Sequence, residues 1–559
     1  MTALWANGTR LREARHPDTG FFRPEGFSIT VTTNGVGKSA KMCAKCSVVV
    51  PEDVAMKFEG VSAEELARAT VTANYYWHGD RRPIDRYDAK TRTFEVSDLS
   101  YARWCKWSPK TMLTLVGLRS VLDIPGEWLV DSERSRVLYI PHPGEQIGKV
   151  RFEAARPGLE RLVTVTGDPS LGRSVRGIVF SHIDFAGSDS SRLHVHGSQA
   201  AIWCAAAIEV EGATGCRFDG CRITGTGEYA LRLGAGCVSN AITSCVFSDL
   251  GAGGIIIGET RPRRHKSGVY RPKPGERISP DVLLPWDSFG NCVTNCVLEH
   301  AGLRYPEGVG ILVGHSGFNR IVRNTIRDFR YTGISVGWVW GYSGSVAQEN
   351  EIVGNLITDI GQGELADMGG IYLLGAAYGT RVSGNVIARV ESCDYGGWGI
   401  YTDEGSEGVL IENNVVSDTR HGSFHQNYGK DNVIRNNLFV DGRENAFAVT
   451  RTEKNHCVFT AERNVIVSRY GNIFSTKGPG QPTAEWKNNV FWVSSGQDTA
   501  FNGKSFEEWK SETGHSEAGI LADPLLVSDD KTIWSLDSRS PALRIGFGPI
   551  KGNAGADGF

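Results

Sequence analysis

Residues 364–430 read ELADMGGIYLLGAAYGTRVSGNVIARVESCDYGGWGIYTDEGSEGVLIENNVVSDTRHGSFHQNYGK, and this stretch decides the fold. It contains two near copies, GGIYLLG at 369–375 and WGIYTDEG at 398–405, and in each copy an Asn follows the Ile after 14 residues. A third copy places a Ser and an Asn at the corresponding positions. Repetition at a nearly fixed period predicts a solenoid in which each copy is one coil. The paired positions are Ile371 and Asn385, Ile400 and Asn414, and Ser423 and Asn437.

The same column of polar residues extends through most of the chain. It recurs at steps of 23 to 31 residues, except for one step of 51 that represents either two coils or one coil with a basic, proline-rich insertion around 261–280. Such spacing fits a parallel β-helix with three short strands per coil, stacked at about 4.8 Å. An inward amide can bond the coil above, and a thiol can fill the same place, so we expect the column to be structural. Its members are Cys221, Cys245, Cys296, Asn324, Asn355, Asn385, Asn414, Asn437, Asn464 and Asn489.

The repeat also divides the chain. Residues 1–165 lack it and contain short β-type runs between turns, which predicts a β-rich, sandwich-like module that is partly inserted. Its aromatic residues, such as Tyr75 and Trp107, are expected in the core and its rim, with a sugar-binding surface as the alternative. Residues 166–500 are predicted to form a right-handed parallel β-helix. Residues 501–559 are expected to close its C-terminal end, because a solenoid needs covered ends. The predicted fold class is therefore all-β.

Composition excludes several classes of function. The formal net charge of −3 gives no electrostatic argument for a nucleic-acid partner. No apolar run reaches 18 residues, so we expect no membrane span. A single CxxC sequence, Cys43 to Cys46, has no second pair, and no cluster of His, Cys or acidic residues shows ligand spacing, so we expect no metal and no cofactor. Nothing in the sequence indicates the oligomeric state.

Acidic and aromatic residues gather where the copies differ. Side chains alternate along a strand, so an inward Ile400 would direct Tyr401 and Asp403 outward. In the neighbouring coils we expect Tyr372 on one side and Gln426 on the other. Asp403 should then lie on an exposed sheet face between aromatic rings.

Two carboxylates across a groove are the minimum for glycoside hydrolysis, because one protonates the leaving oxygen while the other attacks or activates water. We take Asp367 and Asp403 as the candidate catalytic pair, with Glu404 as first substitute and Asp394 as a competitor. If the strands were straight, the pair would lie about 23 Å apart, so it works only if the turn at Asp367 folds back over the sheet. A turn-forming role is the alternative for each acid.

Aromatic and amide side chains near these acids suit the faces and hydroxyls of sugars. The loop GWVWGYSGS at 337–345 is expected to wall the groove. His425, one place before Gln426, would point inward and is either a core histidine or a catalyst. The candidate substrate-binding residues are Trp340, Tyr372, Trp398, Tyr401, His425, Gln426 and Tyr428.

The segments LADMGGIYLLG, YGGWGIYTDEGS, FHQNYGK and RNNLF resemble the right-handed parallel β-helix proteins of glycoside hydrolase family 141. PGEWLVDSERSRVLYIP resembles an element of their inserted β module, and DPLLV with SPALRIGF resembles their C-terminal element. The resemblance covers most of the chain. It implies α-L-fucosidase- or xylanase-type hydrolysis by two Asp on the central coils, and the matching positions are Asp367 and Asp403. Asn427 stands where relatives often have His.

The resemblance also implies a secreted or periplasmic protein that acts on a plant or algal polysaccharide. The N-terminal sequence lacks the pattern of a signal peptide, so the protein either stays in the cytoplasm or has lost its signal before this numbering begins. Two other functions remain open. A β-helix polysaccharide lyase would need a Ca²⁺ site or a basic residue as its base, for which Arg330, Lys430 and Arg451 are available. A non-catalytic glycan-binding solenoid would need neither.

Overall fold

The computed structural model divides into two compact units, Met1–Glu160 with Gly187–Trp203 and Arg161–Ala186 with Cys204–Phe559. The side chain of Cys43 and residues 261–268 of the predicted insertion lie outside the described part of the chain. In the part that is described, no helix combines the length and apolar character that a membrane crossing requires. The described residues are 2–34, 41–100, 105–131, 133–190, 197–260, 269–477, 482–530, 533–548, 550 and 554–557.

The first unit consists mainly of antiparallel sheets. Two sheets of four strands each, β5-β6-β10-β9 and β4-β11-β7-β8, contribute buried residues such as Val48 and Leu113 to one apolar core. Tyr75 and Trp107 belong to this core and donate hydrogen bonds of 3.0 Å and 2.8 Å to buried Asp80, so they are core residues. The elements are β1 (Leu4–Ala6), β2 (Thr9–Arg10), β3 (Arg12–Glu13), β4 (Arg15–His16), β5 (Gly26–Asn34), β6 (Lys41–Val49), α1 (Glu52–Met56), α2 (Ala63–Leu66), β7 (Thr70–Tyr75), β8 (His78–Pro83), β9 (Arg86–Asp88), β10 (Thr93–Ser100), β11 (Met112–Val116), β12 (Glu127–Asp131), β13 (Arg136–Tyr139) and β14 (Phe152–Ala154).

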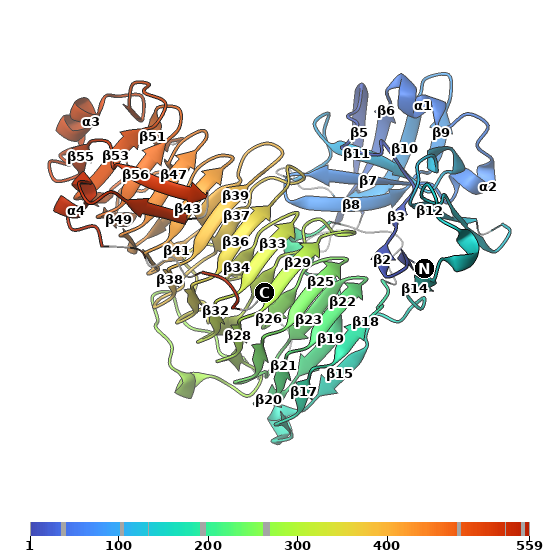
Figure 1. Cartoon of the computed structure of the whole chain (residues 1–559), viewed down its shortest axis with the longest axis horizontal. Coiled ribbons are helices and arrows are strands. Elements are labelled where there is room, and N and C mark those ends of the chain that lie inside the picture. Colours follow the sequence, from blue (N-terminus) through green and yellow to red (C-terminus); the bar gives the residue numbers. More distant parts are fainter. Residues whose placement is uncertain are drawn as a thin grey trace. The chain divides into compact units, whose positions relative to one another are not determined.

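The second unit is a parallel β-helix. Three long parallel sheets, of twelve, eleven and twelve strands, each receive one strand from successive coils. In Figure 1 these strands follow the chain order from teal through green and yellow to red. The predicted fold class, a parallel β-helix with an N-terminal β-rich module, is confirmed.

The first sheet of the solenoid carries the candidate site on its outer face. Its inward face is an apolar column in which Ile334, Ile371, Ile400 and Phe424 pair in register and are fully buried. Its strands are β15 (Val163–Thr166), β19 (Ala206–Glu211), β23 (Tyr229–Leu233), β26 (Ile255–Ile257), β30 (Ile311–Val313), β34 (Ile334–Val336), β37 (Gly369–Leu373), β40 (Trp398–Thr402), β44 (Phe424–Gln426), β48 (Phe447–Val449), β51 (Asn472–Thr476) and β54 (Ala500–Phe501).

The second and third sheets complete each coil. The second sheet contains β17 (Val179–Ser181), β21 (Arg217–Asp219), β24 (Ala241–Thr243), β28 (Cys292–Thr294), β32 (Arg320–Val322), β35 (Glu351–Val353), β38 (Arg381–Ser383), β42 (Leu410–Glu412), β46 (Asn432–Arg435), β49 (Phe459–Glu462) and β52 (Glu485–Lys487). The third contains β18 (Asp184–Ala186), β22 (Arg222–Thr226), β25 (Val246–Leu250), β29 (Val297–Ala301), β33 (Thr325–Phe329), β36 (Leu356–Ile360), β39 (Val386–Val390), β43 (Val415–Thr419), β47 (Leu438–Gly442), β50 (Val465–Ser468), β53 (Asn489–Val493) and β55 (Gly519–Leu521). Short pairs at the turns are β16 (Val175–Arg176) with β20 (Ala213–Thr214), β27 (Ser288–Phe289) with β31 (Ser316–Gly317), and β41 (Ser406–Glu407) with β45 (Gly429–Lys430).

A ladder of buried asparagines joins the coils at the turn between the second and third sheets. Asn385 donates through Nδ2 to Ile352 O and to Asn414 Oδ1, both at 2.9 Å. Its own Oδ1 accepts from the backbone N–H and the Nδ2 of Asn355, again at 2.9 Å. The same pattern links Asn324 to Asn355 and continues beyond Asn414. The predicted inward column is therefore confirmed, and its amides replace the hydrogen bonds that the turn backbone loses on burial.

Replacing Asn385 by Ala is expected to lower the free energy of unfolding by about 2–4 kcal/mol, because it leaves buried groups of Asn355 and Ile352 without partners. Thermal unfolding followed by circular dichroism measures the change. The matched control is Asn472→Ala on an exposed amide of β51, where a change within about 0.5 kcal/mol is expected. Equal effects of the two substitutions would contradict the role assigned to the ladder.

The step of 51 residues is one coil with an insertion. Cys292 of β28 pairs directly with Ala241 of β24, and the backbone N–H of Cys245 meets Cys296 Sγ at 3.4 Å. The additional residues leave the solenoid after β26 and return before β28. This resolves the alternative that the sequence left open, and it places a long loop at one edge of the first sheet.

The C-terminal residues cover both the end and one side of the solenoid. Helix α3 (Phe506–Thr513) starts with a capping box formed by Ser505 and Glu508, and it buries Phe506 and Trp509. Trp509 stacks on Phe501 of the last coil, with ring centroids 4.8 Å apart. The hairpin β56 (Leu526–Asp530) and β57 (Ile533–Leu536) and the helix α4 (Pro541–Arg544) follow, and their side chains pack on outward valines of the third sheet. The tail therefore runs along the third sheet as well as ending the solenoid.

Candidate active site

Asp367 and Asp403 lie at opposite ends of neighbouring strands. Asp403 directly follows β40, and Asp367 precedes β37 of the preceding coil. Between them Tyr372 pairs with Tyr401 on the outer face, with ring centroids 5.1 Å apart and nearly perpendicular. The Tyr372 hydroxyl donates to Asp403 Oδ2 at 2.5 Å, and the Tyr401 hydroxyl donates to Asp367 Oδ1 at 3.1 Å. Two tyrosines thus connect the two acids.

The turn at Asp367 folds back over the sheet. Asp367 has a φ of 53°, in the left-handed region that Asp adopts more readily than most residues. Its backbone N–H donates to Tyr395 O at 3.1 Å, and its carbonyl accepts from the Tyr331 hydroxyl at 3.1 Å. The Asp367 carboxyl group therefore lies over the outer face of the sheet, where Tyr401 can bond it. A catalytic pair with Asp403 requires this arrangement.

The two carboxyl groups have different electrostatic environments. Desolvation, followed by the negative charge of Asp403, raises the pKa of Asp367 to about 7, and hydrogen bonds from Tyr401 and Tyr395 oppose this only in part. Asp403 accepts from Tyr372 at Oδ2 and from Asn427 Nδ2 at Oδ1, the latter at 2.9 Å. Burial, together with the nearby acids, raises the pKa of Tyr372 and Tyr401 well above its usual range, so both hydroxyls remain donors.

The site is more enclosed than the sequence predicts. Tyr372, Trp398 and Tyr401 are each 3% exposed, so the expectation of an exposed sheet face between aromatic rings is wrong. Asp403 is also buried, at 8%. The loop at 337–345 reaches the turn after Asp403, where the Gly341 N–H donates to the carbonyl of Glu404 at 3.2 Å. The loop thus walls the site, as expected.

Trp340 is the exception among the predicted aromatic residues, with 46% of its surface exposed. Its ring packs edge-on against Trp338, at 5.3 Å between centroids. Tyr428 packs against the same loop, where its ring is 5.8 Å from that of Tyr342. Its hydroxyl donates to Glu404 Oε2 at 3.0 Å, and burial followed by the Glu404 charge raises the pKa of Tyr428 to about 12. Glu404 thus bonds Tyr428 beside the two acids, whereas Asp394 is exposed.

The predicted orientations of His425 and Gln426 are wrong. His425 pairs with Tyr401 on the outer face, and Gln426 pairs with Thr402 inside the solenoid. Gln426 is fully buried and bonds Asn432 Nδ2 at 3.1 Å and Val458 O at 3.1 Å, so its amide serves the core. The reason is the register: Phe424, not Ser423, lies opposite Ile400. A shift of one residue exchanges the two faces of a strand.

His425 forms part of an aromatic cluster beside the acids. Its ring lies 3.9 Å from that of Trp398 and 4.8 Å from that of Tyr401, between centroids. Its Nε2 is 3.0 Å from Thr450 Oγ1. Burial lowers the pKa of His425 well below its usual range, so the imidazole is neutral. This favours a packing role over acid–base chemistry.

Three residues of the site were not among the predicted candidates. Asn427 bonds Asp403, Tyr395 bonds the Asp367 turn, and Tyr331 bonds the Asp367 carbonyl. Asn427 and Tyr395 lie in the segments FHQNYGK and CDYGGWG. Because these segments depart from the repeat pattern, the sequence could have identified both residues as candidates. Tyr331 lies one coil earlier, at the end of an ordinary copy, and no feature of its sequence context identifies it.

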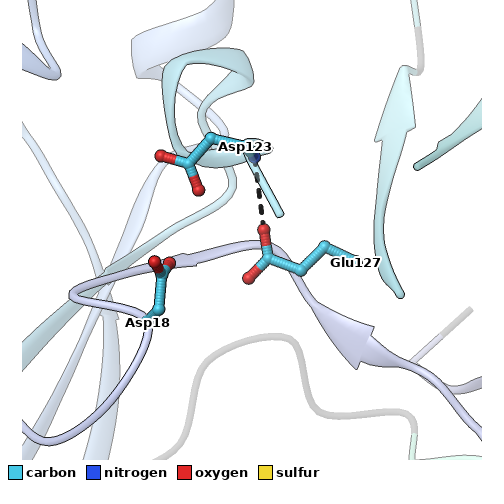
Figure 2. Close-up of side chains that lie close together, drawn as sticks. All are labelled: Asp18, Asp123 and Glu127. Carbon is cyan, nitrogen blue, oxygen red and sulfur yellow. Dashed lines mark hydrogen bonds between the residues drawn. The ribbon is translucent and has the colours of Figure 1, made fainter. Parts of the chain in front are cut away.

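Among the described residues one group of acids is close enough to share a cation. Asp18, Asp123 and Glu127 of the first unit place carboxylate oxygens within 4.8 Å of one another (Figure 2). Glu127 Oε2 accepts from the Asp123 backbone N–H at 3.4 Å. The Arg12 guanidinium donates to Glu127 at 2.9 Å and lies 4.0 Å from Asp18. Because Arg12 already supplies positive charge, we assign no metal to this group.

Comparison with known proteins agrees with the architecture. A family model described as "Right handed beta helix region" matches residues 286–491. The solenoid is a right-handed β-helix. A solved structure described as "Glycoside hydrolase" aligns with a TM-score of 0.62 and 21% identity, over 78% of this chain and 77% of that chain. A mutant of the periplasmic alginate epimerase AlgG aligns with a TM-score of 0.32 and 12% identity, over 53% of this chain and 70% of its own. No curated protein matches the sequence. At 21% identity, the likeness to the first of these structures shows a shared fold.

Proposed function

We propose that this protein is a glycoside hydrolase that acts on a plant or algal polysaccharide or oligosaccharide of the fucoside or xyloside class. The observation that carries the proposal is the pair of acids, Asp367 and Asp403, joined through two buried tyrosines and held in different environments. The resemblance of the central segments to glycoside hydrolase family 141 supports the reaction class. The likeness to a solved structure described as a glycoside hydrolase supports it as well.

In this proposal Asp367 is the proton donor. A pKa of about 7 keeps its carboxyl protonated in mildly acidic solution, which a general acid requires. The proton passes to the glycosidic oxygen as the bond between that oxygen and the anomeric carbon breaks. Asp367 is left as a carboxylate, and the leaving sugar departs as a neutral alcohol.

Asp403 acts as the second carboxylate of the reaction, either as the nucleophile or as the general base. Both of its oxygens accept hydrogen bonds, from Tyr372 and from Asn427, so it is held as an acceptor. It either attacks the anomeric carbon, and water later hydrolyses the glycosyl–enzyme bond, or it takes a proton from the water that attacks directly. In both cases the positive charge that develops on the sugar lies near its carboxylate.

Tyr372 and Tyr401 act as positioning residues. Replacing Tyr372 by Phe removes the donor to Asp403 Oδ2, so kcat is expected to fall by about 10-fold or more while KM changes less, because the orientation of the reacting carboxylate is lost. Steady-state kinetics measure the changes in kcat and in KM separately. Tyr470→Phe on an exposed ring is the matched control and should leave both constants unchanged. An unchanged kcat in Tyr372→Phe would contradict the positioning role.

The lyase alternative has less support. Its candidate bases are engaged elsewhere: Arg330 bonds Glu364 at 2.8 Å, Lys430 bonds Glu407 at 2.6 Å, and the Arg451 guanidinium lies 4.1 Å from the ring centre of Tyr428. A base in elimination must be free to take a proton from the sugar ring. The carboxylate pair therefore remains the better explanation of the site.

A panel of fucosides, xylosides and the corresponding plant and algal polysaccharides tests the proposal. Hydrolysis is expected to release reducing ends without ultraviolet absorbance. Unsaturated, absorbing products would indicate a lyase, and binding without products would indicate a glycan-binding solenoid. Activity is expected to survive treatment with a chelator, whereas loss of activity that Ca²⁺ restores would favour the lyase.

A further inference from the structure

A pocket lies along the same edge of the first sheet as Asp403. It has a volume of about 390 Å³ and is lined by residues that follow successive strands: Glu259 after β26, His315 after β30 and Val339 after β34. The strand order β26-β30-β34-β37-β40 continues directly to Asp403. At a spacing of about 4.8 Å per strand, His315 is about 14 Å from the coil of Asp403 along the solenoid axis.

One loop borders both the pocket and the candidate active site. Val339 and Ser343 of the loop at 337–345 line the pocket. Between them, Gly341 bonds the Glu404 carbonyl and Tyr342 packs against Tyr428. A ligand that follows this edge of the sheet would therefore pass from the acids to the pocket along a single loop.

The walls of the pocket are held in place by buried polar residues. Asp287, 5% exposed, accepts the backbone N–H groups of Tyr270 at 2.9 Å and Leu284 at 2.7 Å. Gln348, fully buried, donates to Glu276 O at 2.8 Å and accepts from the Ile278 N–H at 3.1 Å. These bonds fix the described part of the insertion against the solenoid. A pocket formed before its ligand arrives loses little conformational entropy on binding.

The lining suits a sugar ring. Trp286 and Tyr270 offer aromatic surface, and the neighbouring prolines, Pro272 and Pro274, add apolar surface. In the described part of the chain the His315 imidazole has no hydrogen-bond partner, and burial, followed by the charge of Arg271, lowers its pKa to about 4. A neutral imidazole offers one donor and one acceptor, as a sugar hydroxyl needs. Glu259 and Arg271 both line the pocket, so their opposite charges favour an uncharged ring.

We propose that this pocket binds an uncharged sugar unit of the same glycan, remote from the bond that is cleaved. This rests on the proposed function and extends it: the substrate is an oligosaccharide or polysaccharide that lies along the edge of the first sheet, rather than a small glycoside that occupies the acids alone. Trp286 stacks against the sugar ring, and His315 bonds one of its hydroxyls.

Calorimetric titration tests the proposal on the full chain carrying Asp403→Asn, so that ligands are not consumed. The probes are neutral xylo-oligosaccharides and fucosylated xyloglucan oligosaccharides of increasing length. We expect affinity to rise with the length of the oligosaccharide. Trp286→Ala should lower the gain in affinity of long over short oligosaccharides by at least ten-fold. Ser343→Trp places a bulky ring at the exposed rim and should have the same effect while leaving Trp286 and His315 in place. Tyr470→Ala is the control and should retain the gain.

The outcomes separate the two proposals. If affinity does not depend on length, if no probe binds, or if both variants retain the full gain, the pocket is not a sugar site. If binding shows the expected dependence on length but the wild-type protein cleaves no probe, the pocket inference stands and the hydrolase proposal fails. If the probes are cleaved and neither variant alters the length dependence, the hydrolase proposal stands alone.

Discussion

Replacing Asp403 by Asn is expected to lower kcat on a true substrate by about 10³-fold. An amide neither attacks the anomeric carbon nor takes a proton from water, so the second half of the reaction loses its reacting group. The change preserves shape, and the Asn oxygen still accepts from the Tyr372 hydroxyl. Asn427 Nδ2 loses its acceptor, but removal of the Asp403 charge beside Asp367 offsets that cost. The thermal transition near neutral pH should therefore move little. Steady-state kinetics and differential scanning fluorimetry on the same preparation separate lost chemistry from lost folding.

The matched control for this substitution is Asp498→Asn, on an exposed acid near the C-terminal end of the solenoid, which should leave kcat unchanged. If Asp403→Asn keeps near wild-type turnover, Asp403 only forms the turn after β40. Glu404 would then be tested next, because it follows Asp403 in the chain and its charge also acts on Asp367. Asp394→Asn completes the series as the exposed alternative on the preceding turn.

The solenoid could be predicted because each of its coils needs the same kind of residue at the same position. Each coil must satisfy the buried backbone at the same turn, and Asn355, Asn385 and Asn414 do so at similar spacing. The register of one coil could not be predicted in the same way. The distance from strand to ladder is 14 residues from Ile400 to Asn414 but 13 from Phe424 to Asn437. Because side chains alternate between the two faces of a strand, a shift of one residue moves each of them to the opposite face. The predicted orientations of His425 and Gln426 were reversed for this reason.

The environment of the acids depends on contacts that local sequence does not encode. Whether Tyr401 is exposed is decided partly by His425 of the following coil, whose ring packs 4.8 Å from that of Tyr401. The backbone conformation of Asp367 likewise depends on Tyr395 and Tyr331 from other turns. The deviating positions of the repeat were sufficient to single out Asp367 and Asp403 as candidates, and their catalytic role stays a prediction. The burial of Asp403 and the desolvation that raises the pKa of Asp367 required the folded chain.

Replacing Asp367 by Asn is expected to remove the proton donor, with a loss in kcat that depends on the leaving group. On natural glycosidic bonds the loss should reach about 10²–10⁴-fold, because the departing oxygen needs a proton. On an aryl glycoside with an acidic leaving group it should be much smaller, since that oxygen departs as a stable anion. Asp403→Asn should show no such dependence. Equal losses on both substrates in Asp367→Asn would contradict the role of general acid.

The pH dependence provides an independent check on the same residue. With the wild-type protein, kcat/KM should fall as pH rises through about 7, because desolvation and the Asp403 charge raise the pKa of Asp367 to that value. The Asp367→Asn variant should not show this fall in kcat/KM on the alkaline side.

The stability of the fold should change over the same pH range. The pKa is raised on folding from 3.8, so Asp367 costs no stability below that value and destabilises the fold progressively as pH rises through about 7. Asp367→Asn should therefore raise Tm at pH 8.5 but not at pH values below 3.8, and a Tm difference that does not vary with pH would show that Asp367 titrates as an ordinary surface acid.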